Sequence, residues 1–194
     1  MQYRPFSLVQ KDDIAICRMR DDIDDYQLMA KWLSDEKVLE FYEGRDNPYS
    51  LEQIIEEYAP AVRGEEPVVP CFCLYQNLPI GYLQYYLLTE ADKQNYGDYG
   101  VGEMGNIYGI DLFIGETDYR NQGIGSKLLS LLLTYLFEEL KAAKAVIDPQ
   151  IWNTRAIRCY EKCGFRKIKL LPEHELHEGK YWDSWLMAIE RQNQ

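Results

Sequence analysis

The sequence predicts an α/β domain in which helices flank one mixed sheet, and three features of its patterning lead to this class. Short apolar runs of strand length alternate along the chain with longer segments whose apolar residues recur at helical spacing. Turn residues bound the strand-like runs, and two runs are close enough to form a hairpin. Such alternation is typical of α/β domains. We expect residues 1–194 to form a single domain, a size that buries enough apolar surface to fold without disulfides.

The first half of the chain predicts three strands and two helices. Alternating or continuous apolar residues predict strands over residues 14–19, 68–75 and 80–88, the last two joined by a turn at 77–79. Helical spacing predicts a helix over residues 22–33. Ser50 begins a second helix, which we expect to reach about Ala59 because Pro60 should stop it.

The second half begins with a polar, glycine- and tyrosine-rich segment, residues 89–105, which predicts a long loop. Its apolar stripe makes residues 123–140 the clearest helix of the chain, and Gly164 should end a further helix over 153–163. The remaining apolar runs predict strands over residues 106–114, 143–147, 165–171 and 182–189.

Charge and cysteine content restrict the possible partners. The chain has 21 Lys and Arg against 32 Asp and Glu, a net charge of −11, which disfavours nucleic acid and anionic membranes and suits a polycation or simply solubility. Its five cysteines lack zinc-site spacing, so we expect no metal and a reducing, cytoplasmic setting. No signal-peptide region is visible, and no apolar run reaches the ~18 residues of a membrane span.

The segment Arg120–Gly125 follows a predicted strand and opens the clearest helix. A helix N-terminus presents unpaired N–H groups and positive dipole, and glycine lets the backbone approach a phosphate closely. A dinucleotide-binding fingerprint would need glycine where Leu128 stands, and a Walker loop would need Gly-Lys-Ser/Thr where the order is Gly125-Ser126-Lys127. Taken alone, the segment fits an anion cradle and a tight turn about equally well.

A second motif decides between these interpretations. Arg120, Gly123 and Gly125 match an R/Q-x-x-G-x-G/A signature, and some thirty residues on the chain matches N-x-x-A-x-x-x-Y-x-x-x-G-F through Asn153, Ala156, Tyr160 and Gly164-Phe165. With both halves in order, the chain resembles the GNAT acetyltransferase superfamily. The resemblance implies the GNAT fold, with a central, mixed but mostly antiparallel sheet flanked by helices, and acetyl-CoA as co-substrate.

Further segments resemble the aminoglycoside 6′-N-acetyltransferases, above all the acetyltransferase half of the bifunctional acetyltransferase–phosphotransferase. They are residues 38–42, 108–111, 155–160 and 171–180. The chain stops where a kinase half would begin, so we expect a stand-alone enzyme, monomeric or homodimeric. Phe41-Tyr42 departs from the two tryptophans of some family members, which bears on the preferred aminoglycoside.

The resemblance assigns a role to each candidate site residue. Asp111 and Tyr160 would be catalytic. Acetyl-CoA would be bound by Leu112, Phe113, Ile114, Arg120, Asn121, Gln122, Gly123, Ile124, Gly125, Ser126, Lys127, Asn153, Ala156 and Tyr160. Asn153 could also cap its helix. A polycationic small molecule would be bound by Tyr42, Glu43, Asp98, Asp111, Asp148 and Glu178. We expect a structural or surface role for His174 and His177.

Elementary pKa values test the two catalytic roles. An ordinary Asp near ~3.9 and an amine near ~8–10 differ by roughly 5 units, about 7 kcal/mol, so Asp111 is a base only if its pKa is raised. Otherwise it holds the ammonium, and water takes the proton. A Tyr near ~10 and a thiol near ~8.5 make full proton transfer uphill by about 2 kcal/mol, so Tyr160 needs only to hydrogen-bond the departing sulfur.

Three other functions remain open at this point. A GNAT enzyme acting on a polyamine would fit the acidic charge equally well, and one acting on a protein N-terminus shares the same motifs. A non-catalytic acyl-CoA-binding module would have no need of Asp111 and Tyr160. The segments 38–42 and 171–180 favour an aminoglycoside substrate.

Overall fold

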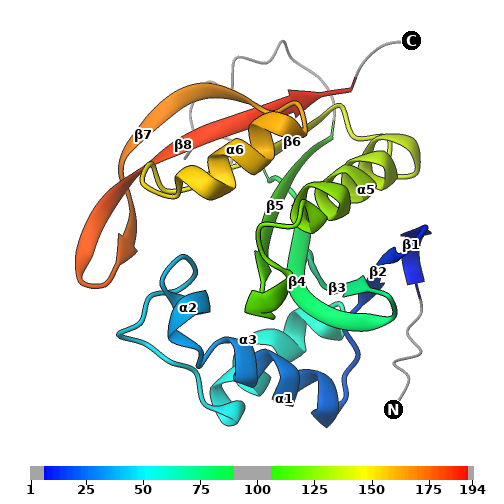
Figure 1. Cartoon of the computed structure of the whole chain (residues 1–194), viewed down its shortest axis with the longest axis vertical. Coiled ribbons are helices and arrows are strands. Elements are labelled where there is room, and N and C mark those ends of the chain that lie inside the picture. The colour runs from blue at the N-terminus through cyan, green and yellow to red at the C-terminus, as the bar shows by residue number, and fades with distance from the viewer. Residues whose placement is uncertain (1–6, 90–105, 192–194) are drawn as a thin grey trace. The chain divides into compact units, whose positions relative to one another are not determined.

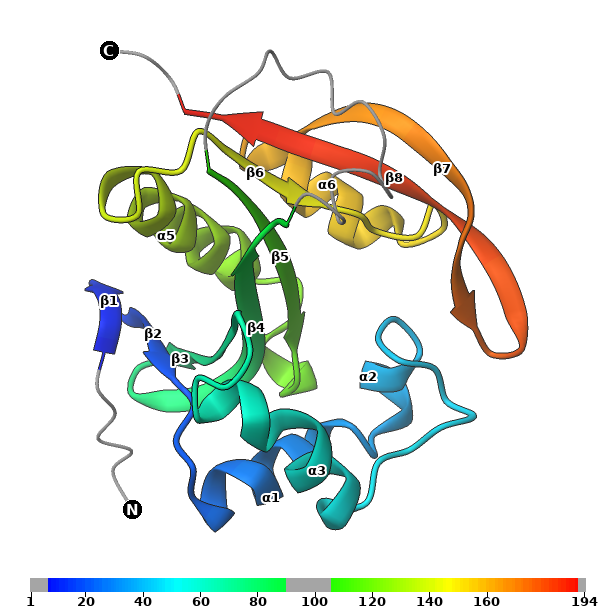
Figure 2. The same ribbon diagram turned by 180° about the vertical axis from the view of Figure 1, so that it is seen from behind.

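The computed structural model of the protein describes residues 7–89 and 106–191 (Figures 1 and 2). The chain forms two compact units: unit 1 comprises Met1–Tyr85 and Asp111–Leu128, and unit 2 comprises Tyr86–Ile110 and Leu129–Gln194. Strands β4 (Leu78–Leu87) and β5 (Ile107–Ile114) and helix α5 (Ile124–Glu138) each contribute to both units.

Unit 1 contains the N-terminal strands and the first helices. Its strands follow the order β1-β2-β3-β4-β5, and β2 is antiparallel to both β1 and β3. The elements before β4 are β1 (Ser7–Lys11), β2 (Ile14–Arg18), α1 (Ile23–Trp32), α2 (Glu36–Leu39), α3 (Leu51–Val62) and β3 (Val68–Tyr75). Both views show α1 and α3 side by side (Figures 1 and 2). Trp32, Phe72 and Tyr82 are among the residues of their shared apolar core.

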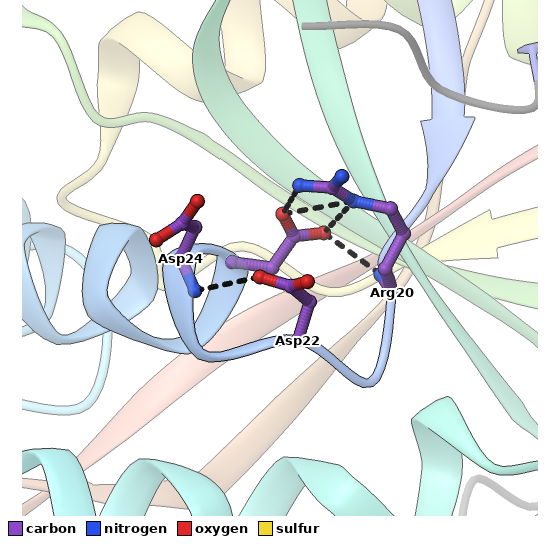
Figure 3. A network of polar contacts seen from close by, with 4 residues as sticks. Arg20, Asp22 and Asp24 are labelled. Carbon is purple, nitrogen blue, oxygen red and sulfur yellow. Dashed lines mark hydrogen bonds and ion pairs between the residues drawn. The ribbon is translucent and has the colours of Figure 1, made fainter.

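A buried ion pair fixes the start of α1 (Figure 3). Asp25 is 1% exposed and accepts hydrogen bonds from the backbone N–H of Arg20, at 2.8 Å, and from its guanidinium. Asp22 caps the helix by accepting from the backbone N–H of Asp24 at 2.9 Å. Since a buried carboxylate is tolerated when it is paired and hydrogen-bonded, the link from β2 can turn sharply into the helix here.

Helix α3 continues past the proline that we expected to end it. The helix begins after Ser50, as expected, and Ser50 and Gln53 form a capping box there. Pro60 lies within the helix, which runs to Val62, so the expected end at Ala59 is wrong. The proline stands in the last turn, where its missing N–H removes one bond, and Arg63 N–H still donates to Ala59 O at 3.0 Å.

Unit 2 contains the C-terminal strands and helix α6. Its strands follow the order β4-β5-β6-β8-β7, with β5 parallel to β6 and β8 antiparallel to both β6 and β7. The elements after α5 are β6 (Lys144–Ile147), α6 (Thr154–Lys162), β7 (Arg166–His177) and β8 (Lys180–Glu190). Figure 1 shows β7 and β8 as one long twisted hairpin. Val146, Leu171 and Leu186 belong to the core of this unit.

The expected fold class is confirmed: the sheet is mixed and mostly antiparallel, with helices around it. Besides the end of α3, other elements differ from the sequence-based expectation, among them β1, α2 and β7. Strand β1 and the short helix α2 were not expected, because β1 is largely exposed and α2 is too short to show a period. Strand β7 was expected to end at Leu171 but continues through Pro172 to His177. β7 ends the strand order, so Pro172 can lack an N–H there, and the register shifts beside it.

Two further expectations concern the loop over residues 89–105 and the absence of a membrane-spanning segment. The expected loop over residues 89–105 lies outside the described residues from position 90 onward, and so does the candidate Asp98. In residues 7–89 and 106–191, no helix is long and apolar enough to cross a membrane.

Candidate active site

The expected anion cradle lies in unit 1, at the start of α5. The first bond of the helix runs from Lys127 N–H to Gly123 O at 3.2 Å, so the N–H groups of the first turn point out from the helix start. Gly123 has a φ of +76°, and a Cβ built on it would meet no atom of the described residues within 4 Å. The left-handed backbone conformation therefore favours glycine, and open space lies beside it. The first turn contains no acidic residue to repel an anion.

The loop before the cradle is held by the Arg120 side chain. Its Nε and one terminal nitrogen donate to Ile114 O at 2.9 and 2.7 Å, and the other donates to Lys37 O at 2.9 Å. Gln122 donates from Nε2 to Asp118 O at 2.6 Å, and Asn121 adopts a left-handed φ of 62°. The guanidinium thus fastens the end of β5 to the segment around Lys37.

A second structural restraint on this loop, which was not expected from the sequence, lies at Gly115. A Cβ on this buried glycine would lie 2.4 Å from the Trp32 indole. The indole Nε1 donates to Glu116 Oε1 at 3.0 Å, and Lys31 forms an ion pair with the same carboxylate. Burial acts to raise the pKa of Glu116, but the hydrogen bonds from Lys31 and Trp32 outweigh it and lower the pKa. A glycine directly after a strand was the available signal.

Asp111 lies in unit 1 on β5, just before the expected acetyl-CoA residues Leu112–Ile114. Gln84 Nε2 on β4 donates to Asp111 Oδ2 at 2.8 Å, and Tyr82 OH donates to Gln84 Oε1 at 2.7 Å. Tyr82 is fully buried, and its ring lies 5.6 Å from that of Phe113. Gln84 was not expected as a site residue, although a single amide in an otherwise apolar strand is a visible signal in the sequence.

Two expected substrate residues, Tyr42 and Glu43, also belong to unit 1. The Tyr42 ring lies 4.8 Å from the Phe113 ring, and burial raises the pKa of its hydroxyl well above the ordinary value. Glu43 is exposed, has a left-handed φ of 68°, and accepts from Tyr49 OH at 3.3 Å. Tyr42 therefore packs among aromatic rings, whereas the Glu43 carboxylate faces solvent.

In unit 2, α6 carries the second motif. Asn153 Oδ1 accepts from Ala156 N–H at 3.2 Å, so its expected capping role is confirmed. Tyr160, two turns into the helix, is 7% exposed, and its ring lies 6.2 Å from that of Phe165. Gly164 ends the helix with a φ of +97°, as the sequence predicts.

Asp148 follows β6 in unit 2 and is paired with a residue that the sequence analysis had set aside. His174 Nε2 lies 2.9 Å from Asp148 Oδ2, and this hydrogen bond raises the pKa of the imidazole, while burial opposes the shift. Glu178 is at the hairpin turn, with a φ of 52°, and its Oε1 lies 3.9 Å from His177 Nε2.

Three buried polar residues are Gln150, in the segment after β6, His177, at the end of β7, and Ser184, on β8. All three are at most 5% exposed, and His177 Nδ1 and Ser184 Oγ have no hydrogen-bond partner among the described residues. Trp152 Nε1 donates to Gln150 Oε1 at 2.5 Å. Within the described part of the chain, no three His, Cys, Asp or Glu side chains are grouped as metal ligands would be.

The chemical capacity of each unit follows from these contacts. Unit 1 offers a helix N-terminus with open space beside Gly123 and a carboxylate, Asp111, oriented by an amide. Unit 2 offers the Tyr160 hydroxyl and the Asp148–His174 pair. In unit 1, the helix N-terminus suits an anion and Asp111 suits a cation. In unit 2, the Tyr160 hydroxyl can donate a hydrogen bond to a leaving group, and the Asp148 carboxylate suits a cation.

The Asp148–His174 contact predicts a pH-dependent stability. Because the folded-state pKa of His174 is above its ordinary 6.5, the pair stabilises the fold fully below that pH and loses its effect as pH rises through the raised pKa. Asp148→Asn should return the His174 pKa towards 6.5, measured by NMR titration. Its loss of thermal stability should be larger at pH 5.5 than at pH 8.5.

Glu173→Gln is the matched control, since it removes an exposed carboxylate next to His174 in sequence. It should leave the His174 titration nearly unchanged. An unaltered His174 pKa in Asp148→Asn would show that the contact does not persist in solution.

Comparison with known proteins shows which family the chain resembles. The family described as "Acetyltransferase (GNAT) domain" matches residues 21–172, which include parts of both units. The aminoglycoside N(6′)-acetyltransferase type 1 of Klebsiella pneumoniae is 31% identical over 143 residues, 74% of this chain and 70% of that protein. The spermine/spermidine N(1)-acetyltransferase of Bacillus subtilis is 28% identical over 97 residues, 50% of this chain and 59% of that protein.

A solved structure agrees with the first of these relatives. The structure of AAC(6′)-Ib in complex with ribostamycin and coenzyme A superposes with a TM-score of 0.74 at 27% identity, covering 93% of this chain and 94% of that one. Family motif, sequence identity and fold therefore agree, and the chain belongs to the GNAT acetyltransferases, in the family of the aminoglycoside 6′-N-acetyltransferases.

Proposed function

We propose that the chain transfers the acetyl group of acetyl-CoA to the 6′-amine of aminoglycosides by direct attack in a ternary complex, and thereby confers resistance. The similarity to an aminoglycoside N(6′)-acetyltransferase over most of the chain carries this proposal. The spermine enzyme matches a shorter stretch, and so the polyamine alternative has less support. We place the reaction in the cytoplasm, with the enzyme as a monomer or homodimer.

The cradle of unit 1 fits the pyrophosphate of coenzyme A. Its backbone N–H groups and the positive end of the α5 dipole favour an anion, and the open space beside Gly123 lets a phosphate approach the backbone. The Arg120 guanidinium, which donates to Ile114 O and Lys37 O, shapes the loop, and we assign ligand contact to the backbone here. Bound acetyl-CoA would supply the thioester that the amine attacks.

Asp111 and Tyr160 would serve the two charges that the reaction creates. The amine attacks the carbonyl carbon, the carbon–sulfur bond breaks, the nitrogen loses a proton and the sulfur gains one. Before this attack the substrate nitrogen is an ammonium, which Asp111 would orient and which gives one proton to water to become the attacking amine. Tyr160 would donate a hydrogen bond that strengthens as negative charge grows on sulfur. Retention of both groups argues against a non-catalytic acyl-CoA-binding module.

The further carboxylates would bind the other ammonium groups of an aminoglycoside. Glu43 is exposed, and Asp148 shares its carboxylate with His174, an arrangement that a substrate ammonium could replace. Glu178 and Asp98 complete the proposed set, and Tyr42, which is half-buried, would contact a sugar ring.

Substitution of Gly123 tests the cradle. Gly123→Val places a β-branched side chain at a φ of +76°, which forces the loop to change conformation, and it also fills the open space. Binding of coenzyme A should weaken by at least about tenfold, or roughly 1.4 kcal/mol, in calorimetry. Gly64→Val, at a φ of +77° in the same unit, is the matched control for backbone strain. Unchanged affinity in a folded Gly123→Val protein would mean that coenzyme A binds elsewhere.

A substrate panel tests the reaction itself. Kanamycin and tobramycin carry a free 6′-amine and should release thiol from acetyl-CoA, whereas a 6′-hydroxyl analogue should not be acetylated at that position. NMR of the product should place the acetyl group on the 6′ nitrogen. Acetylation of another nitrogen would refute the regiochemistry, and turnover with spermidine alone would establish the polyamine alternative.

The role of Asp111 is tested by Asp111→Asn, which keeps the shape and removes the charge. Gln84 donates to this carboxylate, and a donor stabilises the ionised form, which favours the anchoring role. We therefore expect KM for kanamycin to rise more than kcat falls, with the acidic limb of the pH profile retained because it reports the substrate amine. A base would instead show a fall in kcat of roughly 10²–10⁴ and loss of that limb.

A further inference from the structure

A short hydrogen-bonded chain connects the core of unit 1 to Asp111. Tyr82 and Gln84 are two residues apart on β4, so their side chains share one face of the strand. Tyr82 OH donates to Gln84 Oε1 at 2.7 Å, and Gln84 Nε2 donates to Asp111 Oδ2 at 2.8 Å. The Tyr82 end of the chain is fully buried among aromatic rings, including Tyr58 at 5.7 Å and Phe113 at 5.6 Å.

For packing alone, an apolar residue would serve better than Gln84 at this position. Every other residue of β4 is apolar, aromatic, glycine or proline, and its neighbours Leu83 and Tyr85 are buried. A partly buried amide costs free energy unless both its ends are hydrogen-bonded. Here both ends are bonded, and one of the two partners is the proposed acceptor of the substrate ammonium.

The two partners fix the orientation of the amide. An ionised carboxylate is an acceptor only, so the NH₂ end of Gln84 must face Asp111. The carbonyl end then faces Tyr82, which must donate its hydroxyl hydrogen. A flipped amide would set Oε1 against the carboxylate, two acceptors in contact. Because each hydrogen bond polarises the next, the buried hydroxyl strengthens the donation to Asp111.

We propose that Gln84, held by Tyr82, is a positioning residue that aims the Asp111 carboxylate and stabilises its charged form. This inference rests on the proposed function for its kinetic consequence, but not for the contact itself. In the proposed reaction the substrate ammonium meets a carboxylate whose rotation is already restricted and whose charge is already stabilised. An ammonium anchor requires a carboxylate that is oriented and charged in this way. Stabilising the charged form of Asp111 also makes it a weaker base, which opposes proton abstraction by Asp111.

A double-mutant cycle tests whether Gln84 acts through Asp111. Gln84→Met keeps the length of the side chain and removes the amide, and Gln27→Met, at an exposed position of α1 in the same unit, is the matched control. Gln84→Met should lower kcat/KM for kanamycin by about tenfold, mainly through KM. In an Asp111→Asn background the same substitution should have almost no further effect, because the partner charge is gone. Additive effects in the double variant would overturn the proposal.

A titration that needs no catalysis tests the contact directly. The carboxyl carbon of Asp111, followed by NMR, should titrate about one pH unit higher in Gln84→Met than in the native protein, because the charged form has lost a donor. Tyr82→Phe should move the midpoint the same way by less, since the amide remains but is no longer held. Gln27→Met should leave the midpoint unchanged.

These two measurements separate the inference from the proposed function. If the native protein fails to acetylate aminoglycosides but the Asp111 midpoint shifts as expected, the function is refuted and the positioning role stands. If Gln84→Met retains the native unfolding temperature and the native Asp111 midpoint, the positioning role is refuted whatever the substrate. A shift in Tyr82→Phe without one in Gln84→Met would refute the order of the chain.

Discussion

The close approach of the Gly115 backbone to the Trp32 indole is the contact on which the candidate cradle depends. A Cβ at this position would lie 2.4 Å from the ring, so the chain can leave β5 along this path only because position 115 is glycine. The indole then binds Glu116, and the Arg120 guanidinium binds the carbonyl of Ile114. These contacts hold the loop that follows before α5 begins. The first N–H groups of α5 are therefore already oriented, and binding of an anion would need little further ordering of the backbone.

Two of the candidate carboxylates are oriented by groups without a permanent charge. An amide donates to Asp111, and an imidazole is bonded to Asp148. A Lys or Arg at either place would neutralise the carboxylate and compete with a cationic substrate at every pH. An amide restricts rotation without competing for charge, and an imidazole competes only while it is protonated.

The sequence predicted the elements whose signals are local and strong. The apolar stripe of α5, the helix start at Ser50 and the glycine after α6 each depend on residues within one or two helical turns, and all three are present. The element ends expected next to Pro60 and Pro172 are wrong. The free-energy cost of a proline depends on its position in the helix or at the sheet edge, and the local sequence does not give that position.

The residues of the candidate site also fall into those with a local sequence signal and those whose contacts depend on the fold. Gly123 and Asn153 stand in motifs, and their local geometry could be expected from the sequence. Gln84 and His174 acquire their partners 27 and 26 residues away in the chain, through strand pairing and the hairpin, so the sequence alone does not show which groups they contact. Asp98 lies outside the described residues.

The edge position of β7 has a consequence for how this protein can change over generations. An outermost strand has one neighbour, so a residue inserted or exchanged there need not shift the register of the strands further in. The displaced register beside Pro172 shows that this hairpin already accommodates such an irregularity. His174 and Glu178 lie on this part of the chain. An exchange at Glu178, a proposed substrate-binding residue, therefore need not disturb the inner strands, whereas Asp111 lies on β5, which has a neighbouring strand on each side.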